Sequence, residues 1–193
     1  MSFYFGVDYY PEHWPQDRWE TDAVLMEQLG IRVVRMGEFS WTKMEPKEGE
    51  FHFEWLDQAI NTLAAHGIQT VLGTPTAAPP AWMVRQDPDI LPVDSHGLRR
   101  EFGGRHHDCQ SNHHYRQHIR RLVTAMAARF GHHPHVVGWQ VDNELGNSHG
   151  DFCYCPHCEA AFRRWLQQKY GSIEELNRAW GTAFWSQEYS DFH

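Results

Sequence analysis

Two glutamates stand where apolar, strand-like segments become polar. Residues 136–143 read VVGWQVDN, and Glu144 follows them directly. A carboxyl at this position, partly buried beside Trp139, would stay protonated near neutrality and serve as a general acid. Asn143 would offer both a donor and an acceptor to a neighbouring hydroxyl group. The competing interpretation is a surface turn with a solvated glutamate, and both stay open at this point.

Glu38 has the same kind of placement, within the segment MGEFSW at residues 36–41. It is either a second catalytic carboxylate or the anchor of an internal hydrogen-bond network, and we favour the anchor. Tryptophan side chains offer flat faces that stack on the C–H groups of sugars, although an aromatic residue is more often part of a core. Five tryptophans are candidates for such stacking: Trp14, Trp41, Trp82, Trp139 and Trp185.

All four cysteines belong to one spacing pattern. Residues 153–158 read CYCPHC, which places Cys153, Cys155 and Cys158 close together, and Cys109 supplies a fourth thiol 44 residues before Cys153. Four thiolates satisfy tetrahedral Zn²⁺, whereas two disulfides are the alternative that such tight spacing and a reducing compartment disfavour. We therefore expect a zinc ion, with a structural role because four protein ligands leave no position for water.

Composition narrows the class of protein. The chain has 193 residues, of which 41% are hydrophobic, which is enough to form a sizeable core and excludes disorder, collagen-like repeats and coiled coils. The net charge of −8 opposes binding to nucleic acid or to anionic lipid. No apolar run reaches 18 residues, and the start of the chain does not resemble a signal peptide. We expect a soluble, cytoplasmic protein with no nucleic-acid or membrane partner.

The hydrophobic pattern alternates between strands and helices. Near-continuous apolar runs, typical of strands covered on both faces, occupy residues 3–9, 31–39, 68–74 and 136–142. Helical periodicity occupies residues 18–29, 54–65 and 115–130, with two further helices at 156–170 and 172–180. Gly30, Gly67 and Gly181 stand where helices should stop, and Ser172 with Glu175 forms a capping-box spacing. Four arginines of the 115–130 helix are expected on a solvated face: Arg116, Arg120, Arg121 and Arg129.

The order βαβαβαβ requires parallel strands joined by right-handed crossovers. Either a doubly wound sheet or an eight-stranded barrel would carry it. The first strand is followed by GVDYYPE rather than by a glycine-rich dinucleotide loop, so the barrel is favoured. In a barrel, polar residues at the carboxyl ends of strands indicate chemistry. Those residues are Asp8, Glu12, Glu38, Thr74, Thr76, Asn143 and Glu144.

Five segments, in order along nearly the whole chain, resemble the β-galactosidases of glycoside hydrolase family 42. They are MGEFSWTKMEP at 36–46, LGTPTAAPPAW at 72–82, FGGRHHDC at 102–109, VVGWQVDNELG at 136–146 and CYCPHC at 153–158. The resemblance implies a (β/α)8 TIM barrel and retaining hydrolysis of terminal β-galactosides. It implies that Glu144 is the acid/base residue, that Arg105 and Asn143 bind the sugar, and that Trp185 lies near the mouth of the site. It also implies zinc on the four cysteines and a homotrimer.

The same resemblance predicts what residues 1–193 lack. A retaining mechanism needs a second carboxylate about 5–5.5 Å from the acid/base group, and the family places this nucleophile near the end of the seventh strand. Only four strands are predicted here. We therefore expect the N-terminal part of a catalytic barrel, with a Cys-rich zinc loop at about 150–158 and with the nucleophile, the remaining barrel and later domains absent.

Two alternatives remain open. One is a related retaining glycosidase, such as an α-L-arabinopyranosidase, and the other is a zinc-stabilised, truncated carbohydrate-binding fragment without turnover. Half a barrel would also expose strand edges, so we expect self-association or instability of these residues alone.

Overall fold

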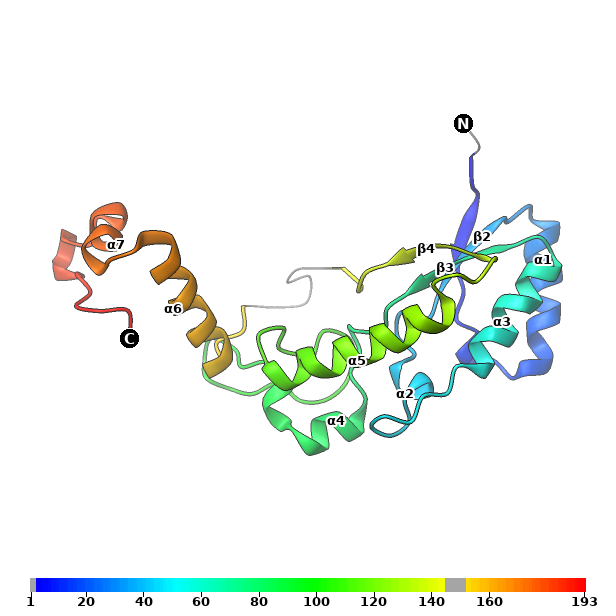
Figure 1. The fold of residues 1–193 in the computed structure, drawn as a ribbon, viewed down its shortest axis with the longest axis horizontal. Helices are drawn as coiled ribbons and strands as arrows, with labels where there is room; N and C mark the ends of the chain where they lie inside the picture. The colour runs from blue at the N-terminus through cyan, green and yellow to red at the C-terminus, as the bar shows by residue number, and fades with distance from the viewer. Residues whose placement is uncertain (1–2, 145–151) are drawn as a thin grey trace.

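Four parallel strands form the single sheet of the described residues. The computed structural model describes residues 3–144 and 152–193 (Figure 1). The strands are β1 (Gly6–Asp8), β2 (Val33–Met36), β3 (Gln69–Gly73) and β4 (Val136–Gln140), arranged in the order β1-β2-β3-β4. All three pairings are parallel. The predicted βαβαβαβ order is confirmed, although each strand is shorter than its apolar run.

The helices agree closely with the sequence periodicity. They are α1 (Trp19–Gln28), α3 (Glu54–Ala65), α5 (His113–Phe130), α6 (Pro156–Tyr170) and α7 (Ile173–Trp180). The sequence did not predict α2 (Trp41–Met44) and α4 (Ala81–Gln86), because helices of one turn or little more are too short to show a period. In residues 3–144 and 152–193 no helix is both long and apolar enough to span a bilayer.

The predicted helix stops and caps are present. Gly30 and Gly67 end α1 and α3 with φ of 77° and 71°, in the left-handed region that glycine tolerates. The backbone N–H of Glu175 donates to Ser172 Oγ at the start of α7, and Gly181 closes that helix with φ of 65°. These local signals let each crossover helix end close to the strand that follows it.

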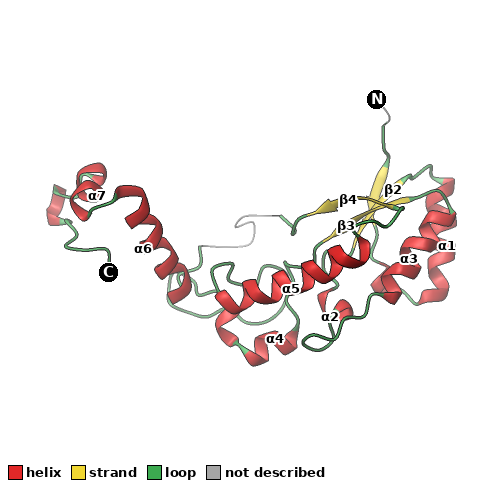
Figure 2. Cartoon of the chain, in the orientation of Figure 1, coloured by secondary structure: helices red, strands yellow, loops and turns green. Residues whose placement is uncertain are grey.

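Helices α1, α3 and α5 lie on one side of the sheet (Figure 2), and the core includes buried residues of these helices and of the strands. Its buried residues include Val34 and Leu72 from the strands and Leu63 and Met126 from the helices. The expectation that every strand is covered on both faces is wrong for the two edge strands. Val7 of β1 and Val137 of β4 are 38% and 54% exposed. In the described residues, each edge strand pairs with only one neighbouring strand.

Helices α6 and α7 form an arm, here residues 152–193, that extends away from the sheet (Figures 1 and 2). The arm starts beside the N-terminal end of α5. Tyr154 N donates to Val93 O at 2.8 Å, and Asn112 Nδ2 lies 3.4 Å from His157 Nε2. The arm is therefore attached to the sheet portion near the start of α5.

A buried ion pair joins α5 to the loop after α2. Glu45 is fully buried; its Oε1 accepts from Gly49 N at 2.7 Å and its Oε2 accepts from Trp41 Nε1 at 2.8 Å. Arg121 Nη2 also bonds Glu45 Oε1, while its Nη1 lies 2.9 Å from Glu48 Oε1. The predicted solvated arginine face is thus wrong for Arg121, which neutralises a buried carboxylate.

Replacement of Arg121 by alanine should lower the free energy of unfolding by about 2 kcal/mol, measured by chemical denaturation. The substitution leaves Glu45 as a buried charge without its counter-ion. Breaking a fully buried ion pair costs roughly 3–5 kcal/mol. The cost is lower here because Arg121 is one-third exposed. Exposed Arg120 on the same helix is the matched control, and Arg120→Ala should change stability by less than about 0.5 kcal/mol. Equal effects of the two substitutions would contradict this role for Arg121.

Candidate active site and cysteine cluster

The carboxyl ends of β3 and β4 are tied together by backbone and side-chain bonds. Thr74 N donates to Gln140 O at 3.0 Å, and Asp142 N donates to Thr74 Oγ1 at 2.7 Å. Thr74, Asp142 and Asn143 are all buried. The turn that leads to Glu144 is therefore attached to the end of the neighbouring strand.

This turn has an unusual backbone. Asp142 and Glu144 have φ of 60° and 46°, in the left-handed region that costs most residues about 1–2 kcal/mol. Asn143 N donates to Asp142 Oδ1 at 2.8 Å, and Gln140 Nε2 donates to Asn143 Oδ1 at 3.4 Å. Asn143 Nδ2 is buried and has no hydrogen-bond partner in the described residues. The side-chain amide of Asn143 is therefore available to donate to a group from outside the described residues.

Glu144 and Arg105 meet in this structure. Glu144 Oε2 lies 3.0 Å from Arg105 Nη2, and the two side chains are 49% and 38% exposed. The sequence predicts partial burial of Glu144 beside Trp139; about half of the Glu144 side chain is exposed here, and Trp139 is itself 36% exposed. Arg105 comes from the segment between α4 and α5, where His106 N donates to Ala77 O at 2.7 Å.

Glu38 anchors a hydrogen-bond network, as predicted. It is fully buried, and its Oε1 accepts from Tyr10 Oη at 3.1 Å and from Arg35 Nε at 3.0 Å. Arg35 Nη2 also lies 2.8 Å from Asp8 Oδ2, at the end of β1. Arg35 was not among the predicted site residues; its signal was a charge between Val34 and Met36 in an apolar run.

Gly73 makes room for Glu38. A β-carbon at position 73 would lie 2.5 Å from the β-carbon of Glu38, which is closer than real contacts allow. Only glycine therefore lets the end of β3 pass this close to the buried glutamate. Neither the requirement nor its partner was visible in the sequence.

The candidate tryptophans have different surroundings. Trp41 and Trp82 point their indole N–H groups at Glu45, at 2.8 and 2.9 Å, and belong to the core or its edge. Trp14 carries the guanidinium of Arg18 4.6 Å above its ring. Trp185 is 80% exposed and stacks on Phe184 with centroids 4.9 Å apart. The 184–186 turn lies on the arm, away from β4 (Figure 1), so Trp185 is not brought to Glu144.

The four cysteines gather at one place, between the loop before α5 and the start of α6. Their sulfur atoms all lie within 4.8 Å of one another, and Cys109 Sγ is 3.4 Å from the sulfurs of both Cys155 and Cys158. None forms a disulfide. Zn–S bonds of about 2.3 Å in a tetrahedron place sulfurs about 3.8 Å apart, so this set fits a zinc ion and not two disulfides.

Local structure holds these thiols in place. Cys109 N donates to Ile90 O at 2.6 Å, and Cys155 is the cap residue of α6, with Pro156 at the first helical position. Burial raises the pKa of Cys109, and it raises the pKa of Cys153 to about 11, so a metal would have to displace their protons. Residues 150 and 151 of the predicted zinc loop lie outside the described residues.

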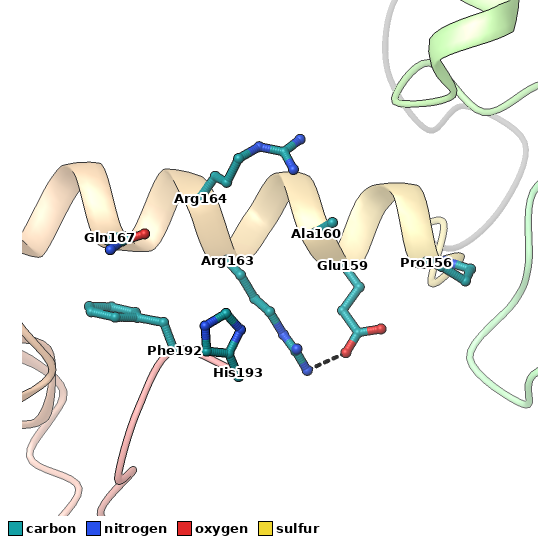
Figure 3. A pocket seen from close by; sticks show the side chains of 8 residues that line it. All are labelled: Pro156, Glu159, Ala160, Arg163, Arg164, Gln167, Phe192 and His193. Atoms are coloured by element: carbon teal, nitrogen blue, oxygen red, sulfur yellow. Dashed lines mark hydrogen bonds and ion pairs between the residues drawn. The ribbon is translucent and has the colours of Figure 1, made fainter.

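Two hollows lie near these groups. One, of about 760 Å³, lies between α5 and the strand ends and is lined in part by Thr74, Thr76, Asp142 and Arg116. Figure 3 shows another, of about 230 Å³, on the arm, where Phe192 and His193 face α6 beside the Arg163–Glu159 ion pair. Neither is lined by Glu144, so Glu144 and Arg105 form an open surface in this structure.

A carboxyl, an amide and a guanidinium lie together at the carboxyl end of the parallel α/β sheet, which is the end where enzymes built on parallel β/α barrels carry their chemistry. The family model of glycoside hydrolase family 42, described as beta-galactosidase, matches residues 8–193. The chain belongs to this family.

Known relatives are similar in sequence and structure to almost the whole chain. The beta-galactosidase of Thermus thermophilus is 56% identical over 97% of this chain. Crystal structures of beta-galactosidases from Marinomonas ef1 and Halorubrum lacusprofundi are each 49% identical, with TM-scores of 0.94 over 98% of this chain. The chain spans only 29% of the Thermus and Marinomonas proteins and 28% of the Halorubrum protein. It corresponds to about the first half of the barrel, as the sequence predicted.

Proposed function

We propose that residues 1–193 supply the acid/base portion of a retaining β-galactosidase that releases terminal β-D-galactose. The observation that carries this proposal is the placement of Glu144 at the end of β4, 3.0 Å from Arg105 and next to Asn143, in a chain of this family. Glu144 protonates the glycosidic oxygen as the bond breaks and then, as a carboxylate, takes a proton from the attacking water.

Arg105 and Asn143 bind the sugar in this proposal. The buried Asn143 Nδ2 lacks a partner in the described residues, so it is ready to donate to a sugar hydroxyl. The Arg105 guanidinium donates to a second hydroxyl while staying close to Glu144. Trp185 contributes a stacking face at the mouth of the site once subunits assemble as a cytoplasmic homotrimer.

The nucleophile lies outside residues 1–193 in this proposal. Double displacement requires a second carboxylate about 5–5.5 Å from the first. Glu38 is unsuited because it is fully buried and accepts hydrogen bonds from Tyr10 and Arg35. The relatives, more than three times as long as this chain, have ample length for a later strand that carries the nucleophile.

Zinc has a structural role in this proposal. Cys109, Cys153, Cys155 and Cys158 hold the ion, which supplies a cross-link between the loop before α5 and the first turn of α6. All four ligands come from the protein, so no position is open for substrate or water.

The stereochemistry of the product tests this function. In the complete gene product, p-nitrophenyl β-D-galactoside should be hydrolysed with retention, so that proton NMR detects β-galactose before mutarotation. A parallel assay with p-nitrophenyl α-L-arabinopyranoside distinguishes the related glycosidase, which would show the higher kcat/KM with that substrate. Residues 1–193 alone should show no turnover above background. Inversion, or turnover by residues 1–193 alone that Glu144→Gln abolishes, would contradict the proposal.

A further inference from the structure

The hydroxyl of Thr74 occupies a special position under the Glu144 turn. Its oxygen accepts the backbone N–H of Asp142 at 2.7 Å, across 68 residues of sequence. Asp142 has φ of 60°, and Asn143 N is bonded in turn to Asp142 Oδ1 at 2.8 Å. The left-handed backbone of Asp142 is therefore held from one side by Thr74 and from the other by its own side chain.

Thr74 is itself fixed. Its N–H donates to Gln140 O at 3.0 Å, which continues the β3–β4 ladder, where Gly73 pairs with Gln140. Thr74 Oγ1 also lies 3.4 Å from Thr76 Oγ1, and Tyr115 Oη donates to Thr76 O. Thr74 and Thr76 are only 5% and 4% exposed, so little of either residue contacts solvent.

We propose that Thr74 is a positioning residue for the acid/base group, because its hydroxyl fixes the Asp142 turn that directs Asn143 and Glu144 toward the sugar. This inference rests on the proposed function. Without the hydroxyl, the amide of Asp142 is a buried donor with no acceptor, and the turn relaxes from its left-handed conformation. A displacement of about 1 Å at a catalytic group costs on the order of 10²-fold in rate.

Leaving-group dependence tests the proposal in the complete gene product. Thr74→Val keeps the shape but removes the acceptor, and should lower kcat/KM for phenyl β-galactoside by about 10–100-fold. With 2,4-dinitrophenyl β-galactoside, whose leaving group needs little protonation, the loss in kcat/KM should be clearly smaller, since general acid catalysis contributes little there and only the placement of Asn143 is affected. Thr74→Ser, which retains the hydroxyl, should restore both values.

Thr70→Val is the matched control. Thr70 is a fully buried threonine within β3, four residues before Thr74, and its hydroxyl has no hydrogen-bond partner in the described residues. Its replacement should leave both kcat/KM values unchanged. An equal loss with both galactosides for Thr74→Val would indicate general damage to the fold and overturn the positioning role, as would unchanged kinetics.

Amide hydrogen exchange of the segment 136–144 gives a readout that is independent of activity. Thr74→Val should speed exchange of the Asp142 amide, whereas Thr74→Ser and Thr70→Val should not. Unchanged exchange in Thr74→Val would overturn the inference. A wild-type protein without β-galactosidase activity would overturn the proposed function instead, and hydrogen exchange would still decide whether Thr74 fixes the turn.

Discussion

Replacement of Glu144 by glutamine in the complete gene product should lower kcat/KM for phenyl β-galactoside by about 10²–10⁴-fold. Glutamine keeps the size of the side chain but cannot deliver a proton to the departing oxygen. The loss should shrink with 2,4-dinitrophenyl β-galactoside, since that leaving group departs without protonation. Azide should then speed turnover by attacking the galactosyl-enzyme in place of water, with β-galactosyl azide as the product.

Arg105→Ala is the comparison variant for this experiment. Arg105 touches Glu144 but is proposed to hold the sugar, so its removal should chiefly raise KM and leave the dependence on leaving group unchanged. Normal rates in Glu144→Gln with all galactosides would show that the acid/base assignment is wrong. An Arg105→Ala variant with the leaving-group profile of Glu144→Gln would show that Arg105 also controls proton transfer.

Chelation of zinc should lower Tm by on the order of 10 °C. The four sulfurs belong to two segments that are otherwise joined by few bonds, at Val93–Tyr154 and Asn112–His157. Without a metal, the cross-link is lost and burial, which raises the pKa values of Cys109 and Cys153, keeps these two thiols protonated. The measurement is scanning calorimetry before and after removal of zinc, with metal content verified by mass spectrometry.

Variants of the cysteine motif test which residues hold the zinc ion. Cys158→Ser should carry little zinc and melt near the temperature of the chelated wild type, whereas His157→Ala, within the same motif, should retain one zinc per chain. An unchanged Tm after verified zinc removal would exclude a stabilising role for the ion. Retention of zinc by Cys158→Ser together with its loss in His157→Ala would assign a different ligand set.

Much of the fold was predictable because its signals are local. The helices at 54–65 and 156–170 were placed at their observed bounds, since an amphipathic period and nearby stop signals act over a few residues. Exposure of Val7 and Val137 agrees with the expected half barrel, although the apolar runs alone predict strands covered on both faces. The half exposure of Glu144 was not evident from its local sequence.

The site was only partly predictable. Motifs marked Glu144, Arg105 and the cysteines, because chemistry restricts residue types at those positions. The support from Thr74 and the counter-ion of Glu45 were not visible, since they join residues 68 and 76 positions apart. Long-range contacts of this kind depend on how crossovers place the strands and helices, which no local pattern records.

The close approach of Gly73 to Glu38 limits the substitutions that position 73 can accept during evolution. A β-carbon at 73 would meet the β-carbon of residue 38, whatever side chain beyond glycine stands there. The α-carbon and the backbone nitrogen of Glu38 would also lie only 2.9 and 3.0 Å from that β-carbon, so a substitution at 73 is accessible to evolution only together with a shift of the backbone after β2. Loss of the glutamate would in turn release Tyr10 and Arg35. A library that randomises position 73 alone should therefore recover few folded variants, whereas substitutions at 38 meet no such steric bar while Gly73 is kept.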